Sequence, residues 1–333
     1  MLIRKLVVVA VAGATLGWSM AAQAQGDSRR PIRIIVPFAP GGPVDLGGRV
    51  IAPKMEERLK QPVIVENRPG GNAAIGAQAV SNAPADAQTL FLQTVAVMTP
   101  VMIKDFSIDV LKDFEPVAPV WNVSYFMFIN SSLPARNVNE FVAHARANAG
   151  KLNYAAGTVS TMLMMETVKA RYGLSVVGIQ YKGSAPSAVA LAANEVQANF
   201  DVAGVLKPHV DSGKVRVLFT TAKKRSAIYP DAPTAEEIGA PDMQFALTGG
   251  LWAKAGAPHP VVDAIGKAVS ETMALPDVVA RFATIGWEVN TGTRDELVRS
   301  VRSEMDFLAK GAKTANYKPE ESVRQSGRHA AQG

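Results

Sequence analysis

The sequence of 333 residues contains no cysteine, which excludes disulfide bonds, thiolate metal sites and cysteine nucleophiles. It also lacks G-x-G-x-x-G, H-E-x-x-H and G-x-S-x-G, the motifs of dinucleotide-binding, zinc-protease and serine-hydrolase sites. After the first residues, no apolar run approaches the ~20 residues that a transmembrane helix needs. The net charge of +6 is spread along the chain, and the compact basic cluster at 223–225 has no aromatic neighbours. These features argue against an enzyme and against a nucleic-acid-binding protein.

Histidine is scarce, and the positions of the four histidines do not have the spacing of metal ligands. His144 lies in an amphipathic helical segment, His209 follows a proline, and His259 stands between two prolines. We expect surface or packing roles for these three residues, and the sequence predicts neither a metal site nor a cofactor.

The chain begins with the pattern of a secretory signal peptide. Arg4 and Lys5 precede an apolar segment that is too short to span a bilayer, and Ala22-Gln23-Ala24 has the small-x-small pattern of a cleavage site. We therefore predict cleavage after Ala24 and export to a bacterial periplasm. The alternative is a single membrane anchor. No cysteine follows the apolar segment, which argues against a lipid anchor.

Strand and helix patterns alternate along the rest of the chain, which predicts an α/β fold with mostly parallel sheets and helices on both faces. Strands are predicted at 32–36, 62–67, 89–94, 121–130, 152–157, 175–181, 196–204, 215–222 and 249–256. Helices are predicted at 44–60, 72–83, 137–150, 161–173, 185–195, 205–213, 260–275 and 294–312.

The length of the chain without its signal peptide exceeds that of a usual single domain and favours two lobes. The chain is expected to cross between them near 126–129 and 247–251. We therefore predict a signal peptide (1–24), lobe 1 (25–127 and 250–320), lobe 2 (128–249) and a mobile tail (321–333). A ligand cleft is expected at the hinge between the lobes.

The loop after the first predicted strand is rich in glycine and proline. Gly41 and Gly42 permit close approach to the backbone, and Pro43 has no amide hydrogen. Unpaired amides at the start of a helix attract an anion such as a carboxylate. The alternative is a tight turn in which Asp45 satisfies those amides itself.

Three further segments follow predicted strands. In the loop 155–162, Gly157 frees the backbone, and Thr158, Ser160 and Thr161 either contact a ligand or only cap the helix. The segment 92–100 is either a third ligand loop or an ordinary turn. Asp201 either accepts a hydrogen bond from an ammonium or water in the cleft, or caps the next helix. The methionines at 162, 164 and 165 are expected to pack in the core.

Seven ordered sequence blocks resemble those of one family, the Bug receptors, which are the periplasmic substrate-binding proteins of tripartite tricarboxylate transporters. The resemblance covers about residues 31–319. The blocks are PIRIIVPFAPGG followed by D, QPVIVENRPGGNAAIGAQAV, GKLNYAA, QYKGSAPS, HVDSGKVRVL, KRSAIYPDAPTAEEIGAP and GLWAKAGAP.

The resemblance implies a two-lobed type II periplasmic-binding-protein fold that closes on its ligand like a Venus flytrap. Each lobe would be a mixed, mostly parallel sheet flanked by helices. It also implies that backbone amides and two ordered waters hold a carboxylate, with Asp201 near the far end of the ligand. The implied ligand-binding residues are Phe38, Ala39, Gly41, Gly42, Asp45, Thr94, Val95, Ala96, Gly157, Thr158, Val159, Ser160 and Asp201.

The chain departs from the family pattern in three places. The segment YAAGTVSTMLMM is one residue shorter, with Met162 at the position of a histidine, and PADAQTL replaces the more usual Pro-Asp-Gly-Tyr-Thr-Leu. The segment 121–130 is more aromatic than the pattern. These departures favour a bulkier or less polar ligand.

We therefore predict a monomeric, cofactor-free receptor that delivers a small organic carboxylate to the membrane subunits of a tripartite tricarboxylate transporter. The ligand would be a dicarboxylate, an acidic amino acid or an aromatic acid. One alternative is a receptor that signals to a membrane histidine kinase. A more distant alternative is a periplasmic hydrolase or lyase, for which the sequence shows no catalytic constellation.

Overall fold

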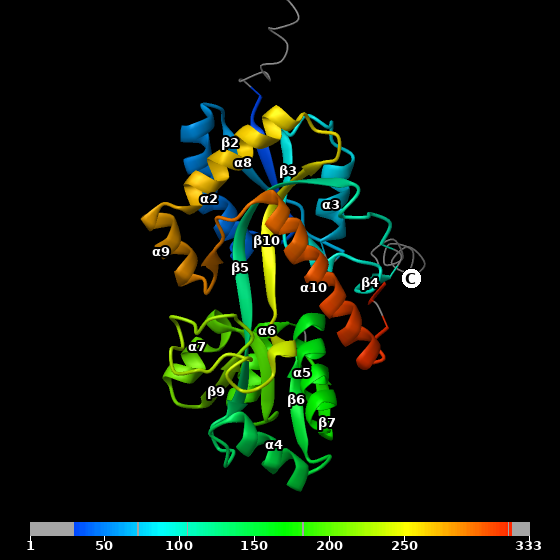
Figure 1. Cartoon of the computed structure of the whole chain (residues 1–333), viewed down its shortest axis with the longest axis vertical. Helices are drawn as coiled ribbons and strands as arrows, with labels where there is room; N and C mark the ends of the chain where they lie inside the picture. The colour runs from blue at the N-terminus through cyan, green and yellow to red at the C-terminus, as the bar shows by residue number, and fades with distance from the viewer. Residues whose placement is uncertain (1–29, 72, 105, 182, 319, 322–333) are drawn as a thin grey trace, which may run out of the picture.

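The computed structural model describes residues 30–71, 73–104, 106–181, 183–318 and 320–321 (Figure 1). The predicted signal peptide and residues 322–333 of the predicted tail lie outside the described residues. In the described part of the chain, no helix combines the length and apolar character needed to cross a membrane.

A mixed sheet of ten strands forms the centre of the molecule, in the order β2-β1-β3-β10-β5-β8-β6-β7, with β9 and β11 also paired to β5. β1, β2 and β3 are parallel, β6 is parallel to β7 and β8, and the long strands β5 and β10 are antiparallel. The strands are β1 (Ile32–Val36), β2 (Val63–Asn67), β3 (Thr89–Gln93), β5 (Phe114–Asn130), β6 (Leu152–Ala156), β7 (Val176–Gln180), β8 (Ala198–Val202), β9 (Val215–Thr220), β10 (Ala246–Lys254) and β11 (Glu288–Val289). The predicted α/β class is confirmed.

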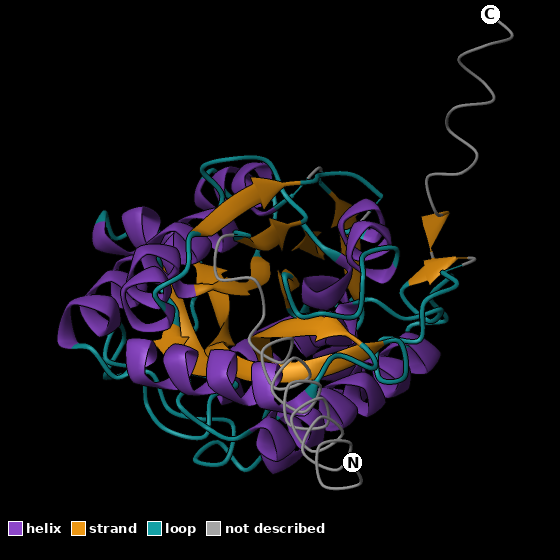
Figure 2. Cartoon of the chain, turned by 90° about the horizontal axis from the view of Figure 1, so that it is seen from above, coloured by secondary structure: helices purple, strands orange, loops and turns teal. Residues whose placement is uncertain are grey.

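Helices surround these strands (Figure 2). They are α2 (Pro43–Leu59), α3 (Ala74–Ser81), α4 (Val138–Ala147), α5 (Val159–Tyr172), α6 (Ser184–Ala192), α7 (Ala203–Asp211), α8 (His259–Met273), α9 (Pro276–Thr284) and α10 (Arg294–Thr314), with the 3-10 turns η2 (Val95–Val97) and η3 (Pro241–Met243). All the predicted helices are present, and α9 was not predicted. A short parallel pair joins β4 (Ile103–Lys104) to β12 (Glu320–Glu321).

The long strand β5 links two groups of elements. Figure 1 shows β1, β2 and β3 with α2, α3, α8 and α9 in the upper part, and β6 to β9 with α4 to α7 in the lower part. β5 pairs with β10 as far as Ser124, and from Tyr125 onward it pairs with β8 and β9. α10 packs against β10, β5, η2 and α5, so it contacts elements of both parts.

Aromatic side chains of β5 pack inside the fold. Trp121 stacks on Trp287 with 4.4 Å between ring centroids, and a Cβ atom at Gly249 would lie 1.8 Å from the Trp121 ring. Phe126 and Phe128 both meet the ring of Tyr229 edge-on. Core packing therefore accounts for Trp121, Phe126 and Phe128, and these three residues do not support the expectation of a bulkier ligand.

The first turn of α10 is held by a capping box. Thr293 Oγ1 accepts a hydrogen bond from the Glu296 amide (3.2 Å), and Glu296 Oε2 accepts one from the Thr293 amide (2.7 Å). Because loss of an N-cap costs about 1 kcal/mol, we expect Thr293→Ala to lower the free energy of unfolding by about that amount. Urea unfolding measures this change. Thr293→Ser is the matched control, and equal midpoints for the alanine variant and the parent would contradict the prediction.

Candidate ligand-binding site

The carboxyl ends of both sets of parallel strands lie near the level at which β5 changes partners. The last residue of β3, Gln93, pairs with Gly250, toward the end of β10 that pairs with Ser124. The last residue of β8, Val202, pairs with Tyr125. The loops that follow these strands therefore emerge toward the same middle level from opposite sides. Open α/β sheets bind ligands at such strand ends.

Asp45 organises the loop between β1 and α2. Its side chain is 2% exposed and accepts hydrogen bonds from the Gly41 amide (2.8 Å) and from Arg49 Nε (2.9 Å). Asn67 Nδ2 donates both to Asp45 Oδ1 (2.8 Å) and to the carbonyl of Phe38 (3.0 Å). Burial raises the pKa of Asp45, but these hydrogen bonds outweigh burial and leave the pKa below its ordinary value. The alternative, in which the Asp45 carboxylate accepts hydrogen bonds from the loop amides, is therefore confirmed for one of them, the Gly41 amide.

The start of α2 retains unpaired donors. Gly42, at the N-cap, has no side chain, and Pro43 has no amide hydrogen. Among the residues that the structure describes, the amides of Val44 and Asp45 have no hydrogen-bond acceptor. These two amides and the positive end of the helix dipole form a site suited to an anion. The exposed loop 38–41 borders them.

The loop between β6 and α5 has a similar helix start. Thr158 Oγ1 accepts from the Thr161 amide (3.2 Å), and Thr161 Oγ1 accepts from the Thr158 amide (3.0 Å), which confirms the capping role for both residues. The amides of Val159 and Ser160 have no acceptor within the described ranges. Burial raises the pKa of Tyr125 far above its ordinary value, although a side-chain hydrogen bond with Ser160 opposes the shift. The start of α5 thus offers a second pair of backbone donors.

The third predicted segment is a buried turn. Thr94 is 7% exposed, and its amide donates to Oε1 of the preceding Gln93 (2.7 Å). Val95 and Ala96 are fully buried in η2, which packs against α10. The structure places these residues beneath a helix, and their contact with a ligand stays a prediction.

Gly157, directly after β6, packs against the first turn of α6. A Cβ atom there would lie 2.5 Å from Ser187 Oγ and 2.9 Å from the carbonyl oxygen of Gly183, so this approach requires glycine. Burial raises the pKa of Asp201, and the side chain of Ser184, in the same turn, opposes that shift. The structure therefore brings two predicted ligand residues, Gly157 and Asp201, to the start of α6.

Asp201 is almost fully buried at the end of β8. Its Oδ1 atom accepts from the Val202 amide (2.8 Å), while its Oδ2 atom has no partner among the described residues. Burial raises the pKa of Asp201 to about 6, against the opposing effects of the Ser184 side chain and the Val202 amide. The N-cap of α7 is Val202 and has no side-chain cap, so the predicted capping alternative for Asp201 is wrong.

Two buried polar residues were not selected from the sequence. Asn199, two residues before Asp201, is fully buried, and neither its side-chain oxygen nor its nitrogen has a partner in the described structure. Asn199 could have been found from the sequence, because side chains alternate along a strand and a residue two positions before Asp201 lies on the same face. Glu304 Oε1, on α10, accepts from the Thr248 amide (2.9 Å), and burial raises the pKa of Glu304 to about 8. In the sequence, Glu304 is one polar residue among many on an amphipathic helix, and no signal marks it.

The predicted core packing of the methionines is confirmed for two of the three. Met164 and Met165 are buried in the core as predicted, and the sulfur of the partly buried Met162 lies 3.5 Å from Gln180 Nε2. Within the described ranges, no three histidine, aspartate or glutamate side chains are grouped so that they could hold a metal ion.

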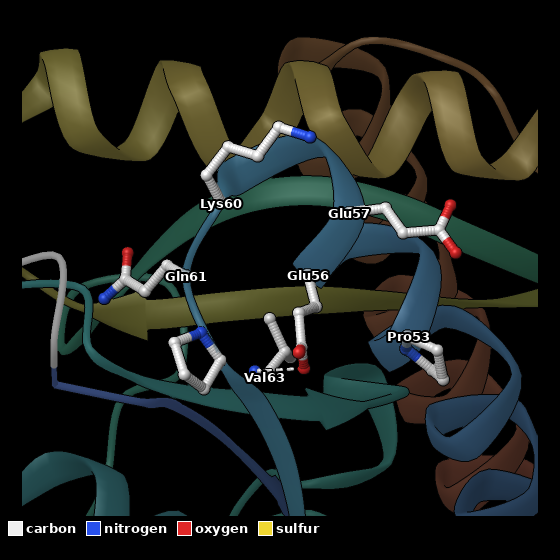
Figure 3. Close-up of a pocket in the computed structure, with 7 residues that line it drawn as sticks. Pro53, Glu56, Glu57, Lys60, Gln61 and Val63 are labelled. Carbon is white, nitrogen blue, oxygen red and sulfur yellow. Dashed lines mark hydrogen bonds between the residues drawn. The ribbon is translucent and has the colours of Figure 1, made fainter.

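A surface pocket lies at the opposite end of α2 from Gly42 (Figure 3). In this pocket Glu56 Oε2 accepts a hydrogen bond from the Val63 amide (3.2 Å), and the side chains of Glu57 and Lys60 are exposed. The pocket contains none of the predicted ligand residues, and the hydrogen bond between Glu56 and Val63 joins α2 to β2. We assign it no part in the ligand site.

This fold, with two helix starts whose amides are unpaired among the described residues, is typical of solute-binding proteins. A family model described as "Tripartite tricarboxylate transporter family receptor" matches residues 48–310. A UPF0065 protein of Bordetella bronchiseptica is 32% identical over 305 residues, which cover 90% of each chain. Among solved structures, the periplasmic binding protein BugD is 29% identical with a TM-score of 0.70, and the match covers 88% of this chain and 99% of BugD.

Two further solved structures are similar to this chain and contain a ligand. One is Rpa4515 of R. palustris with adipate, at 28% identity and a TM-score of 0.73, covering 87% of this chain and 98% of the other. The other is MatC of Rhodopseudomonas palustris with bound malate, at 26% identity and a TM-score of 0.68, covering 85% and 98%.

The chain belongs to the receptor family of the tripartite tricarboxylate transporters, as its sequence blocks predicted. Its fold is that of the periplasmic binding proteins, and the protein is a periplasmic solute receptor, not an enzyme. This result confirms the predicted family, fold and general function.

Proposed function

We propose that the protein binds a small organic carboxylate between the start of α2 and the start of α5 and delivers it to the membrane subunits of its transporter. The observation that carries the proposal is the pair of helix starts, each with two amides that have no acceptor among the described residues. Two similar proteins hold adipate and malate, which are both dicarboxylates. A dicarboxylate, an acidic amino acid or an aromatic acid would suit such donors.

Binding needs only hydrogen bonds and helix dipoles. The carboxylate oxygens would accept from the amides of Val44 and Asp45 on one side, and from those of Val159 and Ser160 on the other. We propose that lobe 1 (25–127 and 250–320) supplies the first pair and lobe 2 (128–249) supplies the second. Closure of the lobes about β5 and β10 would then enclose the ligand.

The proposal extends to processing and partners. We propose that the signal peptide is removed after Ala24 and that the mature protein acts as a monomer. A receptor that signals to a membrane histidine kinase would use the same site. A pull-down of the liganded protein with membranes separates the two roles, because it captures either transporter subunits or a kinase.

A thermal-shift screen of residues 25–333 against small acids and amides tests the proposed ligand class. A ligand at 100 times its dissociation constant adds about 2.7 kcal/mol to the stability of the folded state, so the transition should rise by several degrees. We expect the hits to be carboxylates. Stabilisation by neutral solutes alone, with every carboxylate inactive, would refute the proposal.

A further inference from the structure

One face of α10 packs against the middle of the molecule. Glu304, Phe307 and Gly311 lie on this face, because their spacing of three and four residues matches the turn of a helix. A Cβ atom at Gly311 would lie 3.4 Å from Cβ of Leu163, on α5. Phe307 stacks on Phe245, with 4.3 Å between the ring centroids. This face therefore holds α10 against α5 and against the chain that enters β10 (Figure 1).

Glu304 is the buried acid on this face. Its side chain is 4% exposed, and Oε1 accepts a hydrogen bond from the Thr248 amide (2.9 Å). Its Oε2 atom has no partner among the described residues. The Thr248 hydroxyl donates to Asn122 Oδ1 (3.2 Å) and does not serve this atom. Because buried polar atoms nearly always have a partner, the unpaired Oε2 atom indicates a place for a further polar group.

Tyr125, on β5, links Glu304 to the proposed ligand site. Its ring stacks on Phe245, with 6.0 Å between the centroids, and Phe245 also holds Phe307. Burial is the main cause of the raised pKa of Tyr125, the charge of Glu304 adds to the shift, and the side chain of Ser160 opposes it. The Tyr125 hydroxyl therefore lies within electrostatic range of both Glu304 and the first turn of α5.

A carboxylate bound at the start of α5 would bring a second negative charge close to Glu304. Two carboxylates that share a buried site disfavour each other's charge, so one of them keeps a proton. Burial raises the pKa of Glu304 to about 8, and the proton is therefore already in place at neutral pH. The neutral carboxyl group avoids the repulsion and can donate a hydrogen bond, which an ionised one cannot.

Three ionisable groups act together at this point among the described residues: Glu304, Tyr125 and Asp201. Asp201 has a pKa of about 6, and the pKa of Tyr125 lies far above its ordinary value, so Glu304 is the one of the three whose charge changes between pH 7 and pH 9. Of the elements that pack against α10, η2 has no ionisable side chain. The charged side chains of α5, β5 and β10 are bound elsewhere: Glu166 to Lys169, Arg171 to Asp242, Glu115 to Arg294, and Lys254 to the Ala83 carbonyl. On α10 itself, the neighbouring Arg302 and Asp306 are exposed.

We infer that Glu304 belongs to the ligand site and must carry a proton when a carboxylate binds. At alkaline pH, binding would then take up a proton from the solvent at Glu304, and release of the carboxylate would return it. The receptor would hold its ligand more tightly at neutral than at alkaline pH. This inference rests on the proposed function, since it adds an ionisable group to the same site.

Calorimetry at pH 7 and pH 9 tests the inference. The probe is the tightest binder at pH 7 among adipate, L-malate, succinate and benzoate, or the strongest carboxylate of the thermal-shift screen if none of the four binds. We expect the parent to bind about five- to tenfold more weakly at pH 9, which corresponds to a pKa that rises from about 8 to 9 or above on binding.

Variants assign the effect to Glu304. Glu304→Gln keeps an oxygen that accepts from the Thr248 amide but cannot ionise, so its affinity should be the same at both pH values. Glu57→Gln, at an exposed position on α2, is the matched control and should keep the pH dependence of the parent.

A second measurement needs no variant. Titrations of the parent at pH 8 in two buffers with different ionisation enthalpies count the protons that binding exchanges. Because about half of the free protein is protonated at Glu304 at this pH, we expect an uptake of about 0.4 to 0.5 proton per bound probe. The Glu304→Gln variant should take up close to none.

The outcomes separate this inference from the proposed function. Binding that is equally tight at both pH values, or a weakening that survives in Glu304→Gln, overturns the inference and leaves the carboxylate receptor intact. Equal proton uptake in the parent and in Glu304→Gln has the same meaning. If no carboxylate binds in calorimetry or in the thermal-shift screen, the proposed function and the inference fail together.

Discussion

Replacing Gly42 with valine is expected to weaken ligand binding at least tenfold, or about 1.4 kcal/mol, while the protein remains folded. The backbone at Gly42 has φ −75° and ψ 165°, a conformation that residues with side chains adopt readily. An added Cβ atom would meet only the Ala39 carbonyl oxygen, at 3.6 Å. The fold can therefore accept the side chain, which would crowd the unpaired amides of Val44 and Asp45. Calorimetry with the best carboxylate from the thermal-shift screen measures the loss.

Gly42→Ala is the matched control for this experiment. Alanine and valine are both poor N-caps, so each variant should lose up to about 1 kcal/mol of stability, measured by urea unfolding. Only valine adds a branched side chain in front of the amides. Unchanged affinity in Gly42→Val would show that the ligand does not approach the start of α2.

Replacing Glu304 with glutamine is expected to stabilise the protein by a few kcal/mol above pH 8 and to have little effect below pH 4.5. Burial raises the pKa of Glu304 from 4.5 to about 8, although hydrogen bonds with Thr248 oppose the shift. The unfolded chain releases this proton near pH 4.5, whereas the folded protein keeps it until about pH 8. The free energy of unfolding therefore falls as pH rises through this window, by about 1.4 kcal/mol for each pKa unit.

The Glu304→Gln variant lacks this titration but keeps an oxygen that accepts from the Thr248 amide. Urea unfolding of the parent and the variant at pH 5 and pH 8.5 measures the difference. Glu57→Gln, at an exposed position on α2, is the control. It should change the free energy of unfolding by the same amount at both pH values. A Glu304→Gln variant with the same pH dependence as the parent would show that Glu304 does not titrate as a buried acid.

The regular elements were predictable because their signals are local. The fully buried residues Ile34, Ile35 and Val36 read as a parallel strand covered on both faces. The separate helix α9 was missed because it begins directly after Leu275, where the predicted helix ends, and has only 9 residues. Capping by Thr158 was considered because an N-cap involves neighbours within three residues.

The candidate site was predicted only in part, because its chemistry depends on residues far apart in the chain. The sequence shows Asp45 in the first turn of a helix, but not that Asn67 ties it to the loop. It shows Asp201 at a strand end, but not that one oxygen lacks a partner. Glu304 meets Thr248 across 56 positions, and local patterns do not reveal such a contact.

The sequence by itself determined the family, the order of strands and helices, and the glycine-rich loops that follow the strands, because motifs and periodicity are short-range properties. Only the tertiary structure decided which of the loop amides remain unpaired and which acids are buried without a cation among the described residues. The physical reason is that the hydrogen bonding and burial of a residue depend on all the residues packed around it in the fold. Each polar atom is satisfied or left unpaired by groups that the fold brings together from distant parts of the chain.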